Sequence, residues 1–549
     1  MARLDRLAPA REVAQLGAVI GREFAHELLA AAAGVPADQL EEALERLIAA
    51  ELIVRRGAGP ETTYAFKHTL VQDAAYASLL RSRRQEFHAR LARILEERFS
   101  ERIKAQPELM ARHCTEAGLA AKAIEYWWPA GRLASARSAV AEAIGHFGKA
   151  LELLATLPDT PARAVQELDL LTAQGGALTA ARGYSAAETG RVYARARELC
   201  LQLGDAERLH PLLFGEWVFR MVRADHAAAQ DVGEELLRSG DKGQDDKTAR
   251  LIGHRAVGIS HLWRGNPRAA REHLERMLVL YDPERHRSLA SLYVYDPRLA
   301  GLAGLCIALF QLGYPAQALA RCEEALSEAE QLAHPVGLAY ALHHACLFEH
   351  ARRDPAGVRR RAAALVELCA EQGFPFWGAI GAIFQGWTVA EQGRPAEGGE
   401  RIEEGIAAYR ATGAAQFLPY WLALLADTWR ASGQAEEAVA LLGEALDRSE
   451  ATDERWLEAE LLRRQGEGLL QLGDRNRAET CLLRAISVAR GQGARLWELR
   501  AAVSLARQWR DQGRRGEAHD LLAAVQGGFT EGFDAPDLAE AGQLLESLR

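Results

Sequence analysis

The chain of 549 residues is too long for one hydrophobic core, because single cores stop growing at roughly 250 to 300 residues. Alanine, leucine, glutamate and arginine dominate and aromatic residues make up 7%, which favours exposed helices joined by short turns. The net charge of -9 argues against a nonspecific grip on nucleic acid phosphates. The sequence contains no long apolar run, no signal-peptide core and no CxxC pair, so we expect a reduced, cytoplasmic protein.

Residues 1–80 predict a small mixed domain. Three helical stretches, EVAQLGAVIG, AHELLAAAAG and ADQLEEALERLIAA, precede two β-rich runs that flank a turn from Gly57 to Glu61. Three helices followed by a hairpin are typical of a winged helix. The third helix carries acidic residues such as Asp38 and Glu45, which would face DNA phosphates with the wrong sign. We therefore do not expect this domain to bind nucleic acid.

Residues 81–105 predict a helix that links this domain to a helical array over residues 106–532. In each repeat, a small residue stands seven residues before the turn, and others stand five and twelve residues after it. Each of these three positions, followed through the repeats, is called a small-residue column. The two positions after the turn are seven residues apart and so lie on one face of the second helix. The pattern predicts an all-α, tetratricopeptide-like (TPR-like) right-handed solenoid of about ten helix pairs. Six turn positions follow one another at intervals of 40 residues, namely Gly313, Arg353, Gly393, Gly433, Gly473 and Gly513.

Two segments depart from this regular spacing. Residues 533–549, with a helix from Pro536, are expected to cap the end of the array. The stretch from Tyr281 to Asp296 adds eight residues to the period. Inserted segments in solenoids often carry recognition, but a helix extension that packs against the edge would look the same in the sequence.

The first helix of each pair is expected to line a ligand-binding face. Counting back from the turns gives a mixed aromatic and apolar patch that grades into a charged groove, which suits a peptide or a small effector. The alternative is a solvated inner surface whose aromatic residues contact neighbouring helices. The predicted groove residues are Tyr340, His343, His350, Ile383, Trp387, Tyr420, Asp427, Arg430, Arg463, Arg500 and Arg507. The same count also gives Glu460, Glu467 and Arg510.

Strings along essentially the whole chain, among them YAFKHTLVQDAAYASLLRSRRQEFHARLA and EQGFPFWGAIGAIFQGWTVAEQG, resemble the carboxy-terminal half of a bacterial multidomain family. Its members join a class III adenylate/guanylate cyclase domain to a STAND-type signalling ATPase and then to TPR repeats. The resemblance implies an ATPase or cyclase domain as a partner in cis or in trans. The chain itself has no GxxxxGK[ST] loop and no paired-aspartate cyclase site, so we expect no enzymatic activity. It is interpreted either as a separated sensor half or as the product of a truncated gene.

Two further sites have competing interpretations. His68 ends the second hairpin strand, and the family resemblance implies that it contacts bound nucleotide when an ATPase partner is present; the alternative is an ordinary corner with Thr69 as helix cap. His343, Cys346 and His350 share a helix face and could hold Zn²⁺, but Cys346 falls in the small-residue column. We therefore expect no metal and no cofactor.

The sequence thus predicts a non-catalytic regulatory module in bacterial signal transduction. Its solenoid would bind a protein, a peptide or a small effector and would couple this event to an associated STAND ATPase or cyclase. The alternatives are a TPR-containing transcriptional regulator and a free-standing protein-interaction adaptor. No membrane partner is expected.

Overall fold

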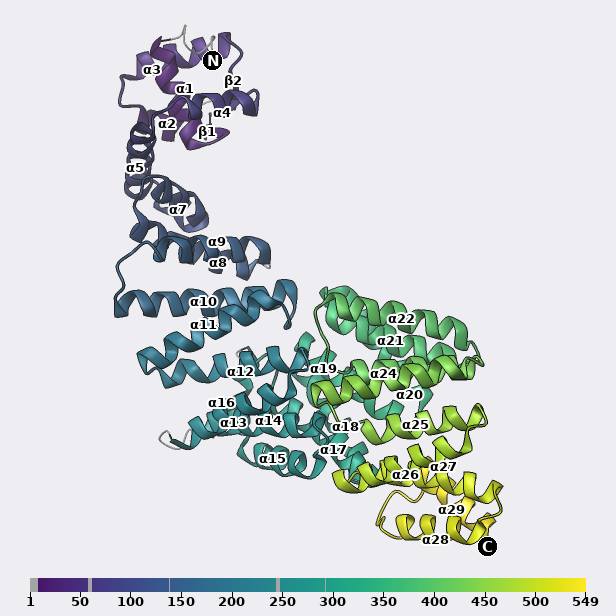
Figure 1. The fold of residues 1–549 in the computed structure, drawn as a ribbon. Helices are drawn as coiled ribbons and strands as arrows, with labels where there is room; N and C mark the ends of the chain where they lie inside the picture. Colours follow the sequence, from purple (N-terminus) through teal and green to yellow (C-terminus); the bar gives the residue numbers. More distant parts are fainter. Residues whose placement is uncertain (1–7, 58–61, 138, 243–246, 292) are drawn as a thin grey trace. The chain divides into compact units, whose positions relative to one another are not determined.

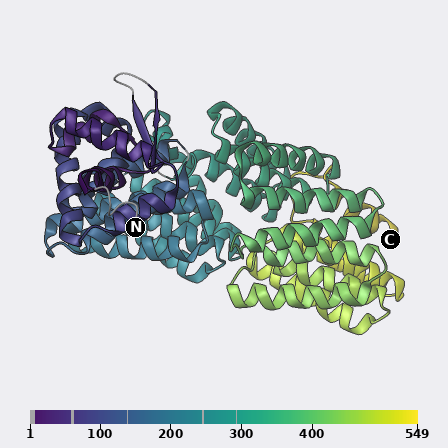
Figure 2. The ribbon, with the colours of Figure 1, turned by 90° about the horizontal axis from the view of Figure 1, so that it is seen from above.

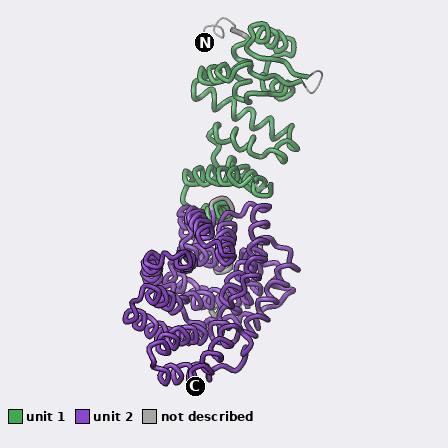
Figure 3. The backbone as a smooth tube through the Cα atoms, turned by 90° about the vertical axis from the view of Figure 1, so that its right-hand side faces the viewer, with its two compact units in different colours: residues 1–181 green, residues 182–549 purple. Residues whose placement is uncertain are grey.

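A computed structural model of the chain describes residues 8–57, 62–137, 139–242, 247–291 and 293–549 (Figure 1). The described residues are mostly helical and form two compact units, residues 1–181 and 182–549 (Figure 3). Each unit has its own hydrophobic core. Among the helices of the described segments, none is both long enough and apolar enough to cross a membrane.

The front of the first unit combines three helices with a small antiparallel sheet in the order β1-β3-β2. The sequence predicts only the hairpin of β2 and β3; the short strand β1 was missed because three residues carry too little alternation to be recognised. Residues 58–61 of the predicted turn from Gly57 to Glu61 lie outside the described residues. The elements are α1 (Ala8–Ile20), β1 (Glu23–Ala25), α2 (His26–Ala33), α3 (Ala37–Ala49), β2 (Ile53–Arg56) and β3 (Thr63–Phe66).

The rest of the first unit is helical. The segment expected as one linking helix consists of α5 and α6, which meet at Phe99. Glycine allows close packing further along, because a Cβ atom at Gly131 would lie 2.4 Å from the Phe147 ring. The helices are α4 (Thr69–Ala77), α5 (Arg81–Arg98), α6 (Ser100–Ala105), α7 (Pro107–Glu116), α8 (Ala120–Ala136), α9 (Val140–Leu154) and α10 (Pro161–Arg182).

The second unit is a TPR-like solenoid of antiparallel helix pairs (Figures 1 and 2). Its first helices are α11 (Ala187–Leu203), α12 (Ala206–Val222), α13 (His226–Lys242), α14 (Lys247–Trp263), α15 (Pro267–Leu280) and α16 (Pro283–His286). The regular pairs are α17 (Pro297–Gln311) with α18 (Pro315–Leu332), α19 (Pro335–Ala351) with α20 (Pro355–Gln372), α21 (Pro375–Glu391) with α22 (Pro395–Ala411), α23 (Leu418–Ala431) with α24 (Ala435–Thr452), α25 (Glu458–Gln471) with α26 (Arg475–Gln492), and α27 (Arg495–Asp511) with α28 (Arg515–Gln526). The last helix is α29 (Pro536–Leu548).

The turns of the six regular pairs explain the column of glycines. All six turn residues have a left-handed backbone, with φ between 65° and 90°. Five are glycine, and the sixth is Arg353, for which φ is 65°. A left-handed backbone costs a residue with a Cβ atom roughly 1 to 2 kcal/mol, so Arg353 stands where its backbone alone would favour glycine.

The small-residue columns are explained by close helix packing. A Cβ atom at Gly386 would lie 2.9 Å from Ile402 Cγ1 and 3.0 Å from the Gly398 carbonyl oxygen. Cys306 and Cys346 occupy the same column and are buried. Packing between the two helices of a pair therefore accounts for both cysteines.

The solenoid turns so tightly that pairs far apart in the sequence touch. Arg264 forms an ion pair with Asp453, 189 residues later, at 2.7 Å. Glu531 accepts a hydrogen bond from the Ala316 N–H, 215 residues away, at 3.0 Å. These separations correspond to about five repeats of the 40-residue period, so one turn of the superhelix contains about five pairs.

The inserted segment packs inward. It contains α16 and a 3₁₀ turn over Arg287–Ser291, and residue 292 lies outside the described residues. Asp296 is buried, accepts a hydrogen bond from Arg298 N–H at 2.7 Å and so caps α17. Tyr281 donates its hydroxyl to the same carboxylate at 2.7 Å. Tyr293 is part of the hydrophobic core of the second unit, and the partly buried Tyr295 packs against that core. The insertion therefore contributes to the core rather than forming a free loop.

Candidate functional site

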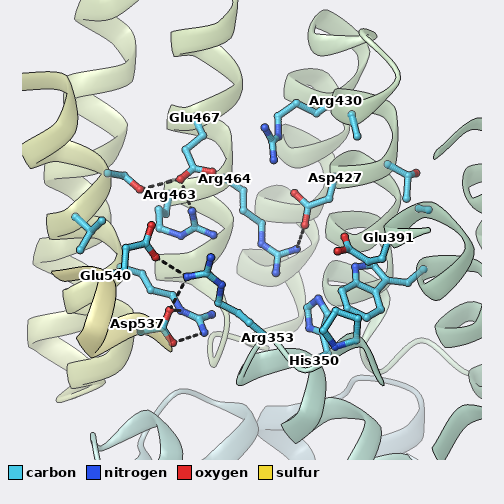
Figure 4. Close-up of a pocket in the computed structure, with 18 of the residues that line it drawn as sticks. His350, Arg353, Glu391, Asp427, Arg430, Arg463, Arg464, Glu467, Asp537 and Glu540 are labelled. Atoms are coloured by element: carbon cyan, nitrogen blue, oxygen red, sulfur yellow. Dashed lines mark hydrogen bonds and ion pairs between the residues drawn. The ribbon is translucent and has the colours of Figure 1, made fainter. Parts of the chain in front are cut away.

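Seven of the eleven predicted groove residues line one pocket of about 530 Å³, called the charged pocket below (Figure 4). They project from the first helices of five successive pairs, α19, α21, α23, α25 and α27, and the last helix α29 closes one side. First helices meet here because the superhelix places one helix of every pair on the same inner face. The seven residues are His350, Trp387, Asp427, Arg430, Arg463, Arg500 and Arg507.

The other four predicted groove residues lie elsewhere. Ile383 is fully buried between the two helices of its own pair and would touch a Cβ atom at Gly405 of α22, so its assignment to the groove is wrong. Tyr420 is buried behind the charged pocket, where its hydroxyl contacts His350 Nδ1 at 2.7 Å. Tyr340 and His343 line a second, smaller cavity.

A buried carboxylate organises the arginines of the charged pocket. Glu460 is 1% exposed and accepts hydrogen bonds from Arg463 at 2.8 and 3.0 Å. Arg500 and Arg464 lie 3.7 and 3.8 Å from the same carboxylate. Burial alone would raise the pKa of Glu460, but the three guanidinium groups overcome it and lower the pKa to about 2. Glu460 is therefore ionised at neutral pH and holds the three arginines in place.

The last helix supplies a second pair of acids. Asp537 accepts a two-point contact from Arg500, with N–O distances of 3.0 and 2.7 Å. Glu540 accepts from Arg353 at 2.5 Å and also pairs with Arg507. These contacts join α29 to α27 and to the turn between α19 and α20 (Figure 4).

Several residues of this network were not predicted as site residues. The sequence carried a signal for Arg353, because it alone interrupts the glycine column. Asp537 and Glu540 stand three residues apart on one face of a helix that was interpreted only as a cap. Arg464 donates to Asp427 at 2.7 Å and was missed because its neighbour Arg463 fits the expected column.

Two charged residues of the pocket are not engaged in this network. Within the described part of the chain, neither Arg430 nor Glu391 forms a side-chain ion pair, although both line the pocket (Figure 4). Burial raises the pKa of Glu391, the charge of Asp427 raises it further, and Arg353 partly opposes the shift. A donor or cation brought beside Glu391 would stabilise its ionised form.

The histidine of the pocket is a neutral wall residue. Burial lowers the pKa of His350 well below its usual value, and the nearby charges of Arg464 and Arg500 act in the same direction. Its ring stands edge-on to Trp387, with centroids 4.8 Å apart. His350 therefore offers hydrogen bonding and a ring surface rather than charge.

The remaining predicted sites occupy different surroundings. Over the described segments, no group of three or more His, Cys, Asp or Glu residues is placed to hold a metal ion. His68 is exposed and stands at the N-cap position of α4 without a side-chain capping bond. Thr69 is the first helical residue, so the interpretation of Thr69 as the cap is wrong.

No protein-family model matches the chain. An uncharacterized protein of Rhizobium meliloti (strain 1021) is 26% identical over 508 residues, which cover 92% of this chain and 49% of that protein. The chain thus spans about half the length of this curated relative.

Among solved structures, the Rap protein in complex with Competence and Sporulation Factor matches with a TM-score of 0.48 and 12% identity, covering 67% of this chain and 97% of that chain. The apo quorum sensor NprR from B. thuringiensis matches with a TM-score of 0.39 and 13% identity, covering 67% and 99%. A STAND protein with a tetratricopeptide repeat sensor from Pyrococcus horikoshii matches with a TM-score of 0.34 and 11% identity, covering 98% and 65%. At these identities the likeness concerns the fold alone. The chain is a TPR-like helical solenoid with a small three-stranded sheet near its N-terminus.

Proposed function

We propose that the chain is a non-catalytic regulatory module that binds a peptide in the charged pocket. The observation that carries this proposal is a contrast within the pocket. The arginines around Glu460 are paired, whereas Arg430 and Glu391 form no side-chain ion pair with any described residue. Because the paired arginines are already held in place, little of their side-chain entropy is lost when a ligand binds to Arg430 and Glu391. A free guanidinium suits a carboxylate, and a free carboxyl suits an N–H donor.

A peptide meets both requirements at once. Its C-terminal or side-chain carboxylate would pair with Arg430, and its amide or amino groups would donate to Glu391. The walls formed by Trp387 and His350 would contact apolar parts of the same ligand. The volume of about 530 Å³ falls within the range of roughly 300 to 1,000 Å³ that is usual for ligand pockets.

The binding test uses the full chain and a pooled library of fluorescent pentapeptides with free C-termini, followed by individual peptides taken from the pools that bind. We expect Arg430→Gln to weaken the best peptide about tenfold, which corresponds to about 1.4 kcal/mol. Arg448→Gln, which removes an exposed ion pair on α24 outside the pocket, is the matched control and should bind as the unaltered chain does. Equal binding by both variants, or no binding pool at all, would reject a peptide site here.

We further propose that the front domain passes ligand binding to an associated ATPase or cyclase domain. The family resemblance supports this coupling, and so does the interpretation of residues 1–80 as a winged-helix-like domain joined by residues 81–105 to the repeats. The test supplies a STAND ATPase or class III cyclase domain of that family in trans and measures nucleotide turnover with and without the chain. Unchanged turnover with both partners, in the presence of a bound peptide, would contradict the coupling but not the peptide site.

The alternative role in transcription has less support. The exposed face of α3 carries Asp38, Glu42 and Glu45, which would repel phosphates. Retention of the chain on duplex DNA at physiological salt would favour a transcriptional role over the one proposed here.

A further inference from the structure

The second cavity of the solenoid, called the aromatic cavity below, has a volume of about 70 Å³ and is separate from the charged pocket. Its wall combines residues of α12, α14, α19 and α21 with two residues of the inserted segment, Val294 and Tyr295. A continuous stack forms one side: Tyr295 lies on Tyr340 with centroids 4.2 Å apart, and Tyr340 lies on His344 at 4.1 Å. The insertion therefore completes a site that the regular repeats alone would leave open.

Arg255 brings an uncompensated charge to this cavity. Its side chain is 1% exposed and lies over the rings of Phe214 and Tyr295, at 4.6 and 4.5 Å. It donates hydrogen bonds to the Tyr293 carbonyl at 3.2 Å and to the Tyr295 hydroxyl, but its Nε has no hydrogen-bond partner, and no carboxylate of the described residues pairs with it. A buried charge without a counter-ion is costly unless an anion completes it.

Two buried histidines add unsatisfied polar atoms at the other end of the stack. His343 is 1% exposed, and neither ring nitrogen has a partner among the described residues. His344 Nδ1 lies 3.0 Å from the Tyr340 carbonyl, so Nδ1 carries the proton and the unpartnered Nε2 is an acceptor. Burial lowers the pKa of His343 well below its usual value and that of His344 to about 4. Both rings are neutral and can exchange hydrogen bonds with a neutral polar group.

The backbone around the cavity is strained. Val294 and Phe417 both line it and both have a left-handed backbone, with φ of 73° and 64°. Such a conformation is unusual for a β-branched or bulky residue, and residues of this kind cluster at ligand-binding sites. The Phe417 conformation is maintained by the buried Glu454 carboxylate, which accepts the Phe417 N–H at 3.0 and 3.1 Å.

We infer that the aromatic cavity binds a short aliphatic carboxylate whose charged end pairs with Arg255 and whose far end bears a hydrogen-bond donor for His343 or His344. The size of the cavity restricts the occupant to fewer non-hydrogen atoms than the six of benzene, because about 70 Å³ is only half of the roughly 150 Å³ that admits benzene. The aromatic walls suit a methylene group between the two polar ends. This site goes beyond the peptide site proposed above, and neither depends on the other.

The test measures binding of three small compounds of similar length to the full chain by calorimetry. These are glycolate, which has both polar ends, acetate, which lacks the donor, and ethylene glycol, which lacks the charge. We expect saturable binding of glycolate, about tenfold weaker binding of acetate and no measurable binding of the diol. Equal binding of all three would mean that the cavity selects neither the charge nor the donor, and saturable binding of none would mean that water alone fills it. Either result would overturn the inference.

Two variants locate the binding site. Arg255→Met removes the counter-charge, and Val218→Phe fills the cavity from α12 without touching a polar group. Both should abolish binding of glycolate, whereas Val279→Phe, on an 86% exposed side chain of α15, should leave it unchanged. Binding that survives Val218→Phe but is lost in Arg430→Gln would assign the carboxylate to the charged pocket and overturn the inference.

Discussion

Arg353 donates a hydrogen bond to Glu540 at 2.5 Å although 187 residues separate them in the sequence. The contact joins the turn after α19 to the last helix, at the edge of the charged pocket. Arg353 makes it from a left-handed backbone that glycine adopts at the five equivalent turns. A non-glycine residue keeps such an unfavourable backbone only where the surrounding structure compensates for the cost. We therefore infer that the contacts of the Arg353 side chain are important for the protein.

The two roles of Arg353 can be separated by two substitutions. Arg353→Ala loses the ion pairs and keeps the backbone strain, whereas Arg353→Gly loses the same pairs and relieves the strain. We expect the glycine variant to be about 1 kcal/mol more stable than the alanine variant, because the left-handed conformation penalises alanine. The ion pairs themselves contribute at most about 1 kcal/mol, since the arginine is half exposed. Thermal and urea unfolding give this comparison.

Both Arg353 variants should also release the last helix. Hydrogen exchange of α29 is expected to accelerate in each of them, because local protection depends on the contacts that hold the helix to its neighbours. Unchanged exchange of residues 536–548 in both variants would show that the apolar face of α29 and its pairs with Arg500 and Arg507 hold the helix without Arg353.

Acid should weaken the network around Glu460. The folded pKa of about 2 lies below the ordinary value of 4.5, so the ionised carboxylate stabilises the fold at neutral pH. This contribution is fully present above pH 4.5 and is lost as the pH falls toward 2. A urea series between pH 6 and pH 3 should therefore show falling stability, and Glu460→Gln should reduce that slope. An identical slope in the variant would rule out Glu460 as a source of the pH dependence.

Glu460→Gln should also be costly at pH 7. The substitution leaves Arg463, Arg464 and Arg500 near a neutral side chain, and breaking a buried ion pair typically costs about 3 to 5 kcal/mol. Glu444→Gln, which removes an exposed pair with Arg448, is the control and should cost less than about 0.5 kcal/mol. Urea midpoints at pH 7 give both values, and comparable losses would contradict the burial argument.

The two most buried arginines of the solenoid interior should respond in opposite ways to the same change. Arg255→Met removes a charge that has no counter-ion, so the ligand-free chain should be equally stable or more stable. Arg464→Met leaves the Asp427 carboxylate without its partner and should destabilise the chain by about 3 kcal/mol. Melting temperatures measured side by side decide between the two. A large loss in Arg255→Met would make that residue structural.

Close packing of the repeat columns can be tested with glycine substitutions. Gly386→Ala would place a methyl group 2.9 Å from Ile402 and 3.0 Å from a backbone oxygen, and overpacking of this kind costs about 1 to 3 kcal/mol. Gly443→Ala, at a half-buried position of α24 whose nearest neighbour lies at 3.8 Å, should instead stabilise by about 0.5 kcal/mol because alanine favours the helix. Destabilisation of similar size in both variants would show that close helix packing does not explain the small residue at position 386.

The sequence alone determined the helical repeat and the inner face. The interval of 40 residues and the small-residue columns arise from contacts between neighbouring helices, which depend on residues close together in the chain. For the same reason, counting back from the turns located seven residues of the charged pocket. The method failed at Ile383, because an apolar residue at an inner position can pack against the second helix of its own pair instead of facing the groove.

Only the tertiary structure decided which distant repeats meet. A small rotation at each pair interface accumulates over about five pairs, and no local pattern records its sum. That sum brings Arg353 to Glu540 and Arg264 to Asp453. It also folds the inserted segment inward, so that Tyr295 closes the aromatic cavity beside Arg255. The helices therefore follow from the order of the residues, whereas both proposed ligand sites depend on how tightly the helices wind.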